Sequence, residues 1–252
     1  MFALVIAACR ATGPAVLPPS SADARDGEAG EPADPPDGDP EDPDDALPAV
    51  APPLAPPASP RAALVLEADR ELAAVVESHY EHRTHVVESD GRFDYDCSGF
   101  VGYALSRAAP AALHVVIEAT RARPLARHFE AFFASPRAPW TRVERAAELV
   151  PGDVIAWLEP PAKHSRNTGH VMIVDRAARP GRQPGEVYVA VIDSSRSGHG
   201  PADARNRDHR GGLGAGELVL LVDRDGRPTG YRWSRSRRSL AYRTEVALGH
   251  LP

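Results

Sequence analysis

A cysteine, Cys97, stands where an acidic segment ends and an apolar helix is predicted to begin. Its neighbours Asp96 and Ser98 are residue types that often open a helix, and apolar residues recur at helical spacing in the segment that follows. The sulfur of Cys97 is therefore expected at a helix N-terminus. Unpaired N–H groups and the positive end of the helix dipole favour a thiolate there, so this cysteine has the position of a nucleophile.

Two later residues could complete such a site. His170 begins an apolar segment that is typical of a strand, and Asp193 ends a second one. A cysteine nucleophile needs a base that takes its proton and a polar group that orients the base. Cysteine, histidine and aspartate in this order predict a catalytic triad.

Each of these residues also has an ordinary structural interpretation. A cysteine among apolar residues is often a small buried hydrophobe, and a histidine at a strand start is often half-exposed. An aspartate that follows a strand often opens a turn. The triad is favoured because the three residue types occur together, each in the helix or strand context that the chemistry requires.

The elements that must position these residues follow a simple order along the chain. Helices are predicted over residues 62–78, 97–108 and, with a break at Pro124, 111–133. Strands are predicted over residues 140–145, 153–158, 170–175, 187–192, 218–222, 231–234 and 243–248. Helices first and strands afterwards predict the α+β class, with N-terminal helices packed on an antiparallel sheet.

Three short blocks carry a resemblance to a known family. They are Asp-Cys-Ser-Gly-Phe-Val at 96–101, Leu-Val-Pro-Gly-Asp-Val-Ile at 149–155 and Gly-His-Val-Met-Ile-Val at 169–174. These blocks resemble the signature blocks of the NlpC family of bacterial cell-wall cysteine peptidases, which have a papain-like fold. The resemblance extends from about Leu64 to the end of the chain and is looser between the blocks.

The resemblance implies roles for the triad residues. Cys97 matches the family's nucleophile and His170 its base. Asp193 stands where the family places its third, orienting residue, which is often a histidine. An aspartate is a departure from that pattern, although a carboxylate can also hold the imidazole in the required tautomer.

The same resemblance implies substrate-binding residues around the nucleophile. Tyr95 matches a tyrosine that precedes the nucleophile in the family, and its hydroxyl is expected to face the reacting centre. Family members that cut free stem peptides bind the N-terminal amine of the substrate with residues that match Asp96 and Ser98.

The implied function is hydrolysis of amide bonds in peptidoglycan stem peptides, in cell-wall remodelling or recycling, with no cofactor. Two alternatives stay open: acyl transfer or deamidation by the same triad, and a non-catalytic binding protein anchored in the envelope. A nucleic-acid partner is not predicted, because the basic excess of the domain is small and scattered. A metal site is not predicted either, because no further ligands accompany His79, His82 and His85.

The first quarter of the 252-residue chain differs in composition from the rest. Residues 21–60 hold 11 acidic residues and one basic residue, and 14 of the 26 prolines lie between residues 14 and 60. Such a tract cannot bury enough apolar surface to fold. We therefore predict a disordered linker over residues 10–61, followed by an NlpC-like catalytic domain over residues 62–252.

The extreme N-terminus resembles a lipoprotein signal. An apolar run ends just before Cys9, although it lacks the basic residues that usually precede such a run. Residues 1–9 therefore predict acylation of Cys9 and membrane anchoring through it. The expected location is the cell envelope, on its periplasmic or extracytoplasmic side, and the expected state is a monomer.

The long polar segment over residues 194–216 follows the predicted triad aspartate directly. Segments of this length without secondary structure are uncommon in compact domains. Two interpretations stay open: a wall of the substrate cleft, with His199, Asp203 and Arg205 available to an anionic peptide, or a mobile surface loop.

Overall fold

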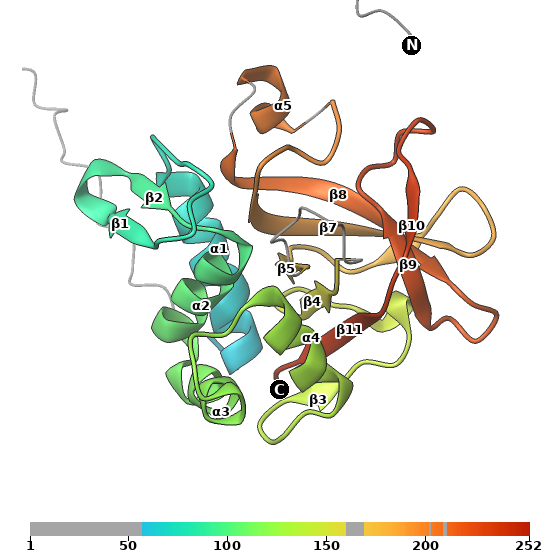
Figure 1. Cartoon of the computed structure of the whole chain (residues 1–252), viewed down its shortest axis with the longest axis horizontal. Coiled ribbons are helices and arrows are strands. Elements are labelled where there is room, and N and C mark those ends of the chain that lie inside the picture. Colours follow the sequence, from blue (N-terminus) through green and yellow to red (C-terminus); the bar gives the residue numbers. More distant parts are fainter. Residues whose placement is uncertain (1–56, 160–168, 202, 209–210) are drawn as a thin grey trace, which may run out of the picture. The chain divides into compact units, whose positions relative to one another are not determined.

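The structure is a computed structural model that describes residues 57–159, 169–201, 203–208 and 211–252 (Figure 1). The predicted signal and nearly all of the predicted linker lie outside the described residues. In the described ranges, helices come first and a large antiparallel sheet follows, which confirms the predicted α+β class. No helix in these ranges has both the length and the apolar character needed to cross a membrane.

Four helices of the described ranges agree in place with the sequence pattern, although the first ends at Ala74 instead of residue 78; a fifth, over residues 204–208, lies in the segment that was expected to lack secondary structure. The helices are α1 (Pro60–Ala74), α2 (Cys97–Ala108), α3 (Pro110–Thr120), α4 (Ala126–Ala134) and α5 (Ala204–Asp208). The Ser59 hydroxyl accepts a hydrogen bond from the Ala62 N–H and caps α1, while Pro60 fills the first position, where no N–H is needed. The predicted break at Pro124 separates α3 from α4.

The strands form one large sheet and one small hairpin. Their bounds are β1 (His85–Val87), β2 (Arg92–Asp94), β3 (Thr141–Arg142), β4 (Val154–Trp157), β5 (His170–Val174), β6 (Arg179–Pro180), β7 (Glu186–Ser195), β8 (Gly212–Val222), β9 (Pro228–Arg232), β10 (Ala241–Arg243) and β11 (Val246–His250). The large sheet has the order β10-β9-β8-β7-β5-β4-β11-β3, with β6 paired to β7. β1 and β2 form a separate two-stranded sheet, and Arg92 of β2 also bridges Glu77.

Helices α1 to α4 lie together on one side of the large sheet, and α5 lies apart from them, near β8 (Figure 1). Successive residues of β5 enter two different apolar clusters, because Val171 and Ile173 pack with the helices and Met172 and Val174 pack on the opposite face. Both faces of this strand are therefore covered. This explains why its sequence is continuously apolar instead of alternating.

The β7–β8 hairpin is longer than the sequence pattern predicts. β7 continues past Asp193 to Ser195, and β8 begins at Gly212, so that Ser195 pairs with Gly212 at the end of the ladder. The pattern did not indicate a strand over residues 212–217 because glycine, a weak strand former, occupies every second position there. Residues 194–195 and 212–216, at the two ends of the predicted long loop, therefore belong to the strands.

A buried acid–phenol pair joins α1 to the segment before α2. The Tyr95 hydroxyl donates a hydrogen bond to Glu71 Oε2 at 2.6 Å, and both residues are fully buried. Burial raises the pKa of Glu71 to about 8, against the opposing effect of this hydrogen bond. The carboxyl group therefore holds a proton in the folded protein at a pH at which it is ionised in the unfolded chain.

This raised pKa predicts a loss of stability as the pH rises. The stabilising contribution is complete below about pH 4.5 and is lost as the pH rises through about 8, because ionised Glu71 is poorly solvated. Urea unfolding at pH 5, 7 and 9 should show that Glu71→Gln loses less stability over this range than the wild type, with a difference on the order of a few kcal/mol.

Glu148→Gln, which alters a half-exposed glutamate, is the control and should follow the wild type. Parallel pH profiles for the wild type and Glu71→Gln would show that Glu71 does not titrate as described.

Candidate active site

Cys97 is the first residue of α2, where the sequence predicted it. The carboxylate of Asp96 caps this helix: its Oδ1 accepts hydrogen bonds from the Gly99 N–H at 2.7 Å and from the Ser98 hydroxyl at 2.8 Å. Cys97 is 4% exposed and is a free cysteine. The cap fixes the first turn of the helix, and with it the position of the sulfur.

His170 and Asp193 come together because β5 and β7 are neighbours in the sheet. The two strands pair with Ile173 opposite Ile192, which brings the start of β5 beside the end of β7. His170 Nε2 lies 2.6 Å from Asp193 Oδ2, and both side chains are buried. Because Asp193 occupies Nε2, Nδ1 is the ring nitrogen of His170 that is available to the Cys97 sulfur.

The charges around His170 favour its protonated form. Burial alone would lower the pKa of His170, but the negative charge of Cys97 and hydrogen bonds to Asp193 and Cys97 outweigh it and raise the pKa to about 10. The rings of Trp157 and Trp233 lie 5.4 and 5.1 Å from the imidazole and cover it. The structure thus brings all three predicted triad residues into one buried constellation.

Removal of the sulfur should lower the pKa of His170. In Cys97→Ser the neighbouring group is a neutral hydroxyl, so the imidazolium loses one of its two anionic neighbours, and its pKa is expected to fall by about one or more. The measurement is an NMR titration of the His170 ring. The ring signals of the exposed His114 serve as an internal reference between the two samples. An unchanged His170 titration would show that no thiolate faces the ring.

Tyr95 does not face the reacting centre, so the sequence-based placement of its hydroxyl is wrong. That hydroxyl instead donates to Glu71 of α1, because a buried phenol needs a hydrogen-bond partner. Only the Tyr95 backbone carbonyl is close to the triad strand, where it accepts a hydrogen bond from the Ser194 hydroxyl at 2.6 Å.

Tyr80, and not Tyr95, is the tyrosine whose side chain lies against Cys97. Burial raises the pKa of Tyr80, and the charges of Cys97 and Asp96 together with a hydrogen bond to Cys97 raise it further. The guanidinium of Arg196 lies 5.4 Å from the centre of its ring. A signal for this residue exists in the sequence: Tyr80 is the one Phe, Tyr or Trp in the polar connection over residues 79–92.

Asp96 and Ser98 lie beside the nucleophile as predicted, but Asp96 already has basic partners. Arg123 Nη2 lies 2.6 Å from Asp96 Oδ1, and His82 Nδ1 lies 3.3 Å from Oδ2. The Arg123 side chain is 45% exposed at this edge of the site. Binding of a substrate amine by Asp96 and Ser98 stays a prediction, and such an amine would have to compete with Arg123 for the carboxylate.

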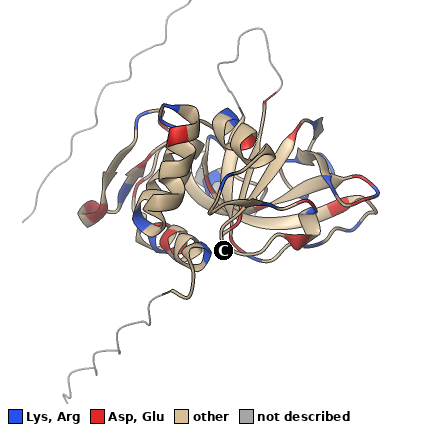
Figure 2. Cartoon of the chain, turned by 90° about the horizontal axis from the view of Figure 1, so that it is seen from below, with Lys and Arg blue, Asp and Glu red and all other residues tan. Residues whose placement is uncertain are grey.

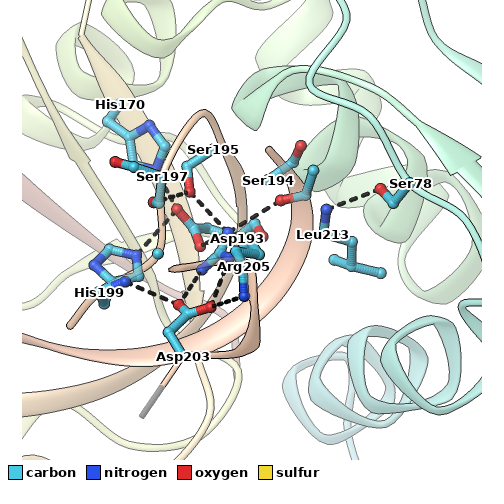
Figure 3. A network of polar contacts seen from close by, with 12 residues as sticks. Ser78, His170, Asp193, Ser194, Ser195, Ser197, His199, Asp203, Arg205 and Leu213 are labelled. Carbon is cyan, nitrogen blue, oxygen red and sulfur yellow. Dashed lines mark hydrogen bonds and ion pairs between the residues drawn. The ribbon is translucent and has the colours of Figure 1, made fainter. Parts of the chain in front are cut away.

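Three polar residues after β7, His199, Asp203 and Arg205, are buried. His199 and Arg205 lie against the Asp193 carboxylate, and Asp203 pairs with Arg205 (Figure 3). The expectation that they are available to an anionic peptide is therefore wrong. The sequence pattern could not show this, because burial of these charges depends on an ion-pair partner at the end of another strand.

Charged residues of both signs alternate over the described ribbon, and neither sign collects on one face in the view of Figure 2. Several carboxylates form pairs with arginine at the surface, including Glu67 with Arg70 and Glu217 with Arg235. This arrangement gives the surface no single strong field.

A comparison with known proteins finds one informative relative. An uncharacterized protein of Acanthamoeba polyphaga mimivirus is 30% identical over 187 residues, which cover 65% of this chain and 82% of the viral protein. No family model and no solved structure matches the chain. On the strength of this identity over most of the viral protein, the chain belongs to the same family as that mimivirus protein.

Proposed function

We propose that this protein is a cysteine-dependent amide hydrolase of the NlpC type, with a papain-like arrangement of helices and sheet, that acts on peptidoglycan stem peptides. One observation carries the proposal: Cys97 at the start of α2, His170 at the start of β5 and Asp193 near the end of β7 meet in one buried cluster. Nucleophile, base and orienting acid then stand in the relation that such catalysis needs.

In the proposed reaction, the Cys97 thiolate attacks the amide carbonyl carbon and forms a C–S bond. The carbonyl electrons move to oxygen, and the oxyanion accepts hydrogen bonds from the Cys97 N–H and the Tyr80 hydroxyl. When the C–N bond breaks, His170 donates its proton to the leaving amine. A thioester remains. His170 then takes a proton from water, which attacks the thioester, releases a carboxylic acid and restores the thiolate and imidazolium.

Asp193 would hold the imidazole throughout this cycle. Its fully buried carboxylate fixes the orientation of the ring through Nε2 and stabilises the positive charge that the ring carries. Buried Trp157 and half-buried Trp233 cover His170 and limit its contact with water, which strengthens these electrostatic interactions.

Digestion of purified muropeptides, followed by mass spectrometry, tests the proposal. Hydrolysis predicts two products whose masses sum to those of the substrate and one water. Acyl transfer would give a product joined to an added amine, and deamidation would release ammonia without a chain break. Muropeptides that stay intact, with a Cys97 that reacts with thiol probes, would overturn the substrate class and leave the nucleophile standing.

Envelope location and anchoring through an acylated Cys9 belong to the same proposal, although Cys9 lies outside the described residues. Cell fractionation of the full chain, with and without Cys9→Ser, is the test. We expect the wild type in the membrane fraction and Cys9→Ser outside it. Equal distribution of the two proteins would end the anchor proposal without affecting the hydrolase.

A further inference from the structure

The Asp193 carboxylate has a second contact that the proposed reaction does not use. Its Oδ2 faces His170, while its Oδ1 lies 2.9 Å from Arg205 Nη1. Burial alone would raise the pKa of Asp193, but Arg205, followed by His199 and His170, holds it well below its usual range. A carboxylate with no exposed surface thus keeps its charge because a buried cation lies against it.

Arg205 is itself fixed from several directions. Its Nε and Nη2 donate to the two carboxylate oxygens of Asp203 at 3.0 and 2.7 Å, a two-point contact that sets the plane of the guanidinium. Its Nη1 also donates to Ser195 Oγ at 2.7 Å and to the Gly212 carbonyl at 3.0 Å. Since Arg205 is 6% exposed and each of its three nitrogens donates to a neighbouring residue, its guanidinium faces the interior and not a substrate.

The glycines of β8 make room for this arrangement. Gly214 and Gly216 are two residues apart in β8 and therefore lie on the same face of the strand. A Cβ on Gly214 would overlap the Arg205 guanidinium, and a Cβ on Gly216 would lie 2.5 Å from His199 Cβ. Neither glycine has a positive φ, so space and not backbone conformation explains them. The alternating glycines that weaken this strand are therefore the signature of a segment packed onto it.

His199 completes the surroundings of the carboxylate. Its ring stacks on Trp233 at 4.1 Å, its Nε2 lies 3.2 Å from Asp193 Oδ2, and its Nδ1 lies 3.0 Å from the Trp233 carbonyl oxygen. Both ring nitrogens thus face oxygen atoms. Figure 3 shows His170 and His199 on the same side of Asp193, with Arg205 and Asp203 beneath it.

We propose that Arg205 is a positioning residue for the triad: oriented by Asp203 and seated over Gly214, it holds Asp193 so that Oδ2 meets His170. The placement of Asp193 by Arg205 rests on the contacts alone, whereas the catalytic role of that placement rests on the proposed function. Within the polar segment over residues 194–216, for which the sequence left cleft wall and surface loop open, His199, Asp203 and Arg205 then support the catalytic acid.

The test compares two strand glycines. Gly214→Ala should displace Arg205, whereas Gly249→Ala in β11 creates a similar overlap with the Phe133 ring, away from Asp193, and controls for general destabilisation. The first measurement is the proton NMR signal of the His170 Nε2–H, which a short bond to a carboxylate moves far downfield. We expect this signal in the wild type and in Gly249→Ala, and its loss or upfield shift in Gly214→Ala.

The second measurement is turnover. Gly214→Ala and Arg205→Met should lower kcat by about a hundredfold with little change in KM, because a misplaced catalytic group affects the chemical step and not binding. Arg205→Lys keeps the charge, is expected to fold and should fall between these variants and the wild type, because a lysine lacks the planar fork. Alkylation of Cys97 should persist in all of them.

The proposal is overturned if folded Gly214→Ala and Arg205→Lys keep both the downfield signal and full kcat, or if Gly249→Ala loses both to the same degree. A wild-type protein that shows the downfield signal but cuts no muropeptide would instead contradict the proposed function and leave the positioning role intact. The two failures are therefore distinguishable.

Discussion

Cys97→Ala is expected to abolish hydrolysis of muropeptides, with a fall in kcat of about five orders of magnitude or more. The alanine cannot form the covalent thioester, and no other described side chain at the site replaces the sulfur. The fold should survive, because a small buried side chain is exchanged for a slightly smaller one in the first turn of α2. The measurement is product formation by mass spectrometry, with circular dichroism and thermal unfolding as checks on the fold.

Cys9→Ser is the matched control for Cys97→Ala, since it removes the chain's other cysteine from a region far from the triad in sequence. In purified protein this variant should hydrolyse muropeptides at the wild-type rate. Substantial activity in Cys97→Ala would remove Cys97 from the mechanism altogether.

Asp193→Asn should lower kcat by about three to four orders of magnitude while Cys97 can still be alkylated. The amide has the shape of the carboxylate but lacks its charge, so it neither stabilises the imidazolium nor selects the tautomer that catalysis needs. Burial, Cys97 and Asp193 together set the pKa of His170, so loss of the Asp193 charge should lower that pKa. The alkaline limb of the pH–activity profile should therefore move to lower pH in this variant.

Asp193→His, compared with Asp193→Asn, tests the contact between this position and Arg205. The family resemblance alone favours histidine at this position, but here Asp193 Oδ1 lies against the buried Arg205. An imidazole would leave that guanidinium with Asp203 as its main carboxylate partner. We therefore expect Asp193→His to unfold at lower temperature than Asp193→Asn, and wild-type activity in Asp193→Asn would exclude Asp193 from the site.

The positions of the triad residues could be predicted because each depends on local sequence. Asp96 and Ser98 indicated the helix start that places Cys97. The apolar run after His170 indicated one strand, and the run before Asp193 indicated another. Local pattern determines where an element begins, and short antiparallel pairing then brings these positions together.

The errors concern partners that only the tertiary structure defines. Tyr95 and Tyr80 are both tyrosines within a short distance of Cys97, and the choice between them depends on whether the hydroxyl meets Glu71 or the sulfur. Arg205 seemed to be a loop residue because a buried arginine is recognisable only when its acidic partners are known. The alternating glycines of β8 were available as a signal, but they indicate a packed neighbour without identifying it.

The central claim, that Cys97 is a thiolate paired with His170 and not a buried structural thiol, is tested most directly by its rate of alkylation. Iodoacetamide labelling at pH 6, in a Cys9→Ser background, should be compared between the folded protein and the urea-unfolded chain. An ordinary thiol is almost entirely protonated at this pH. We expect Cys97 in the folded protein to react about tenfold faster or more. Slower labelling in the folded protein than in the unfolded chain would contradict the claim.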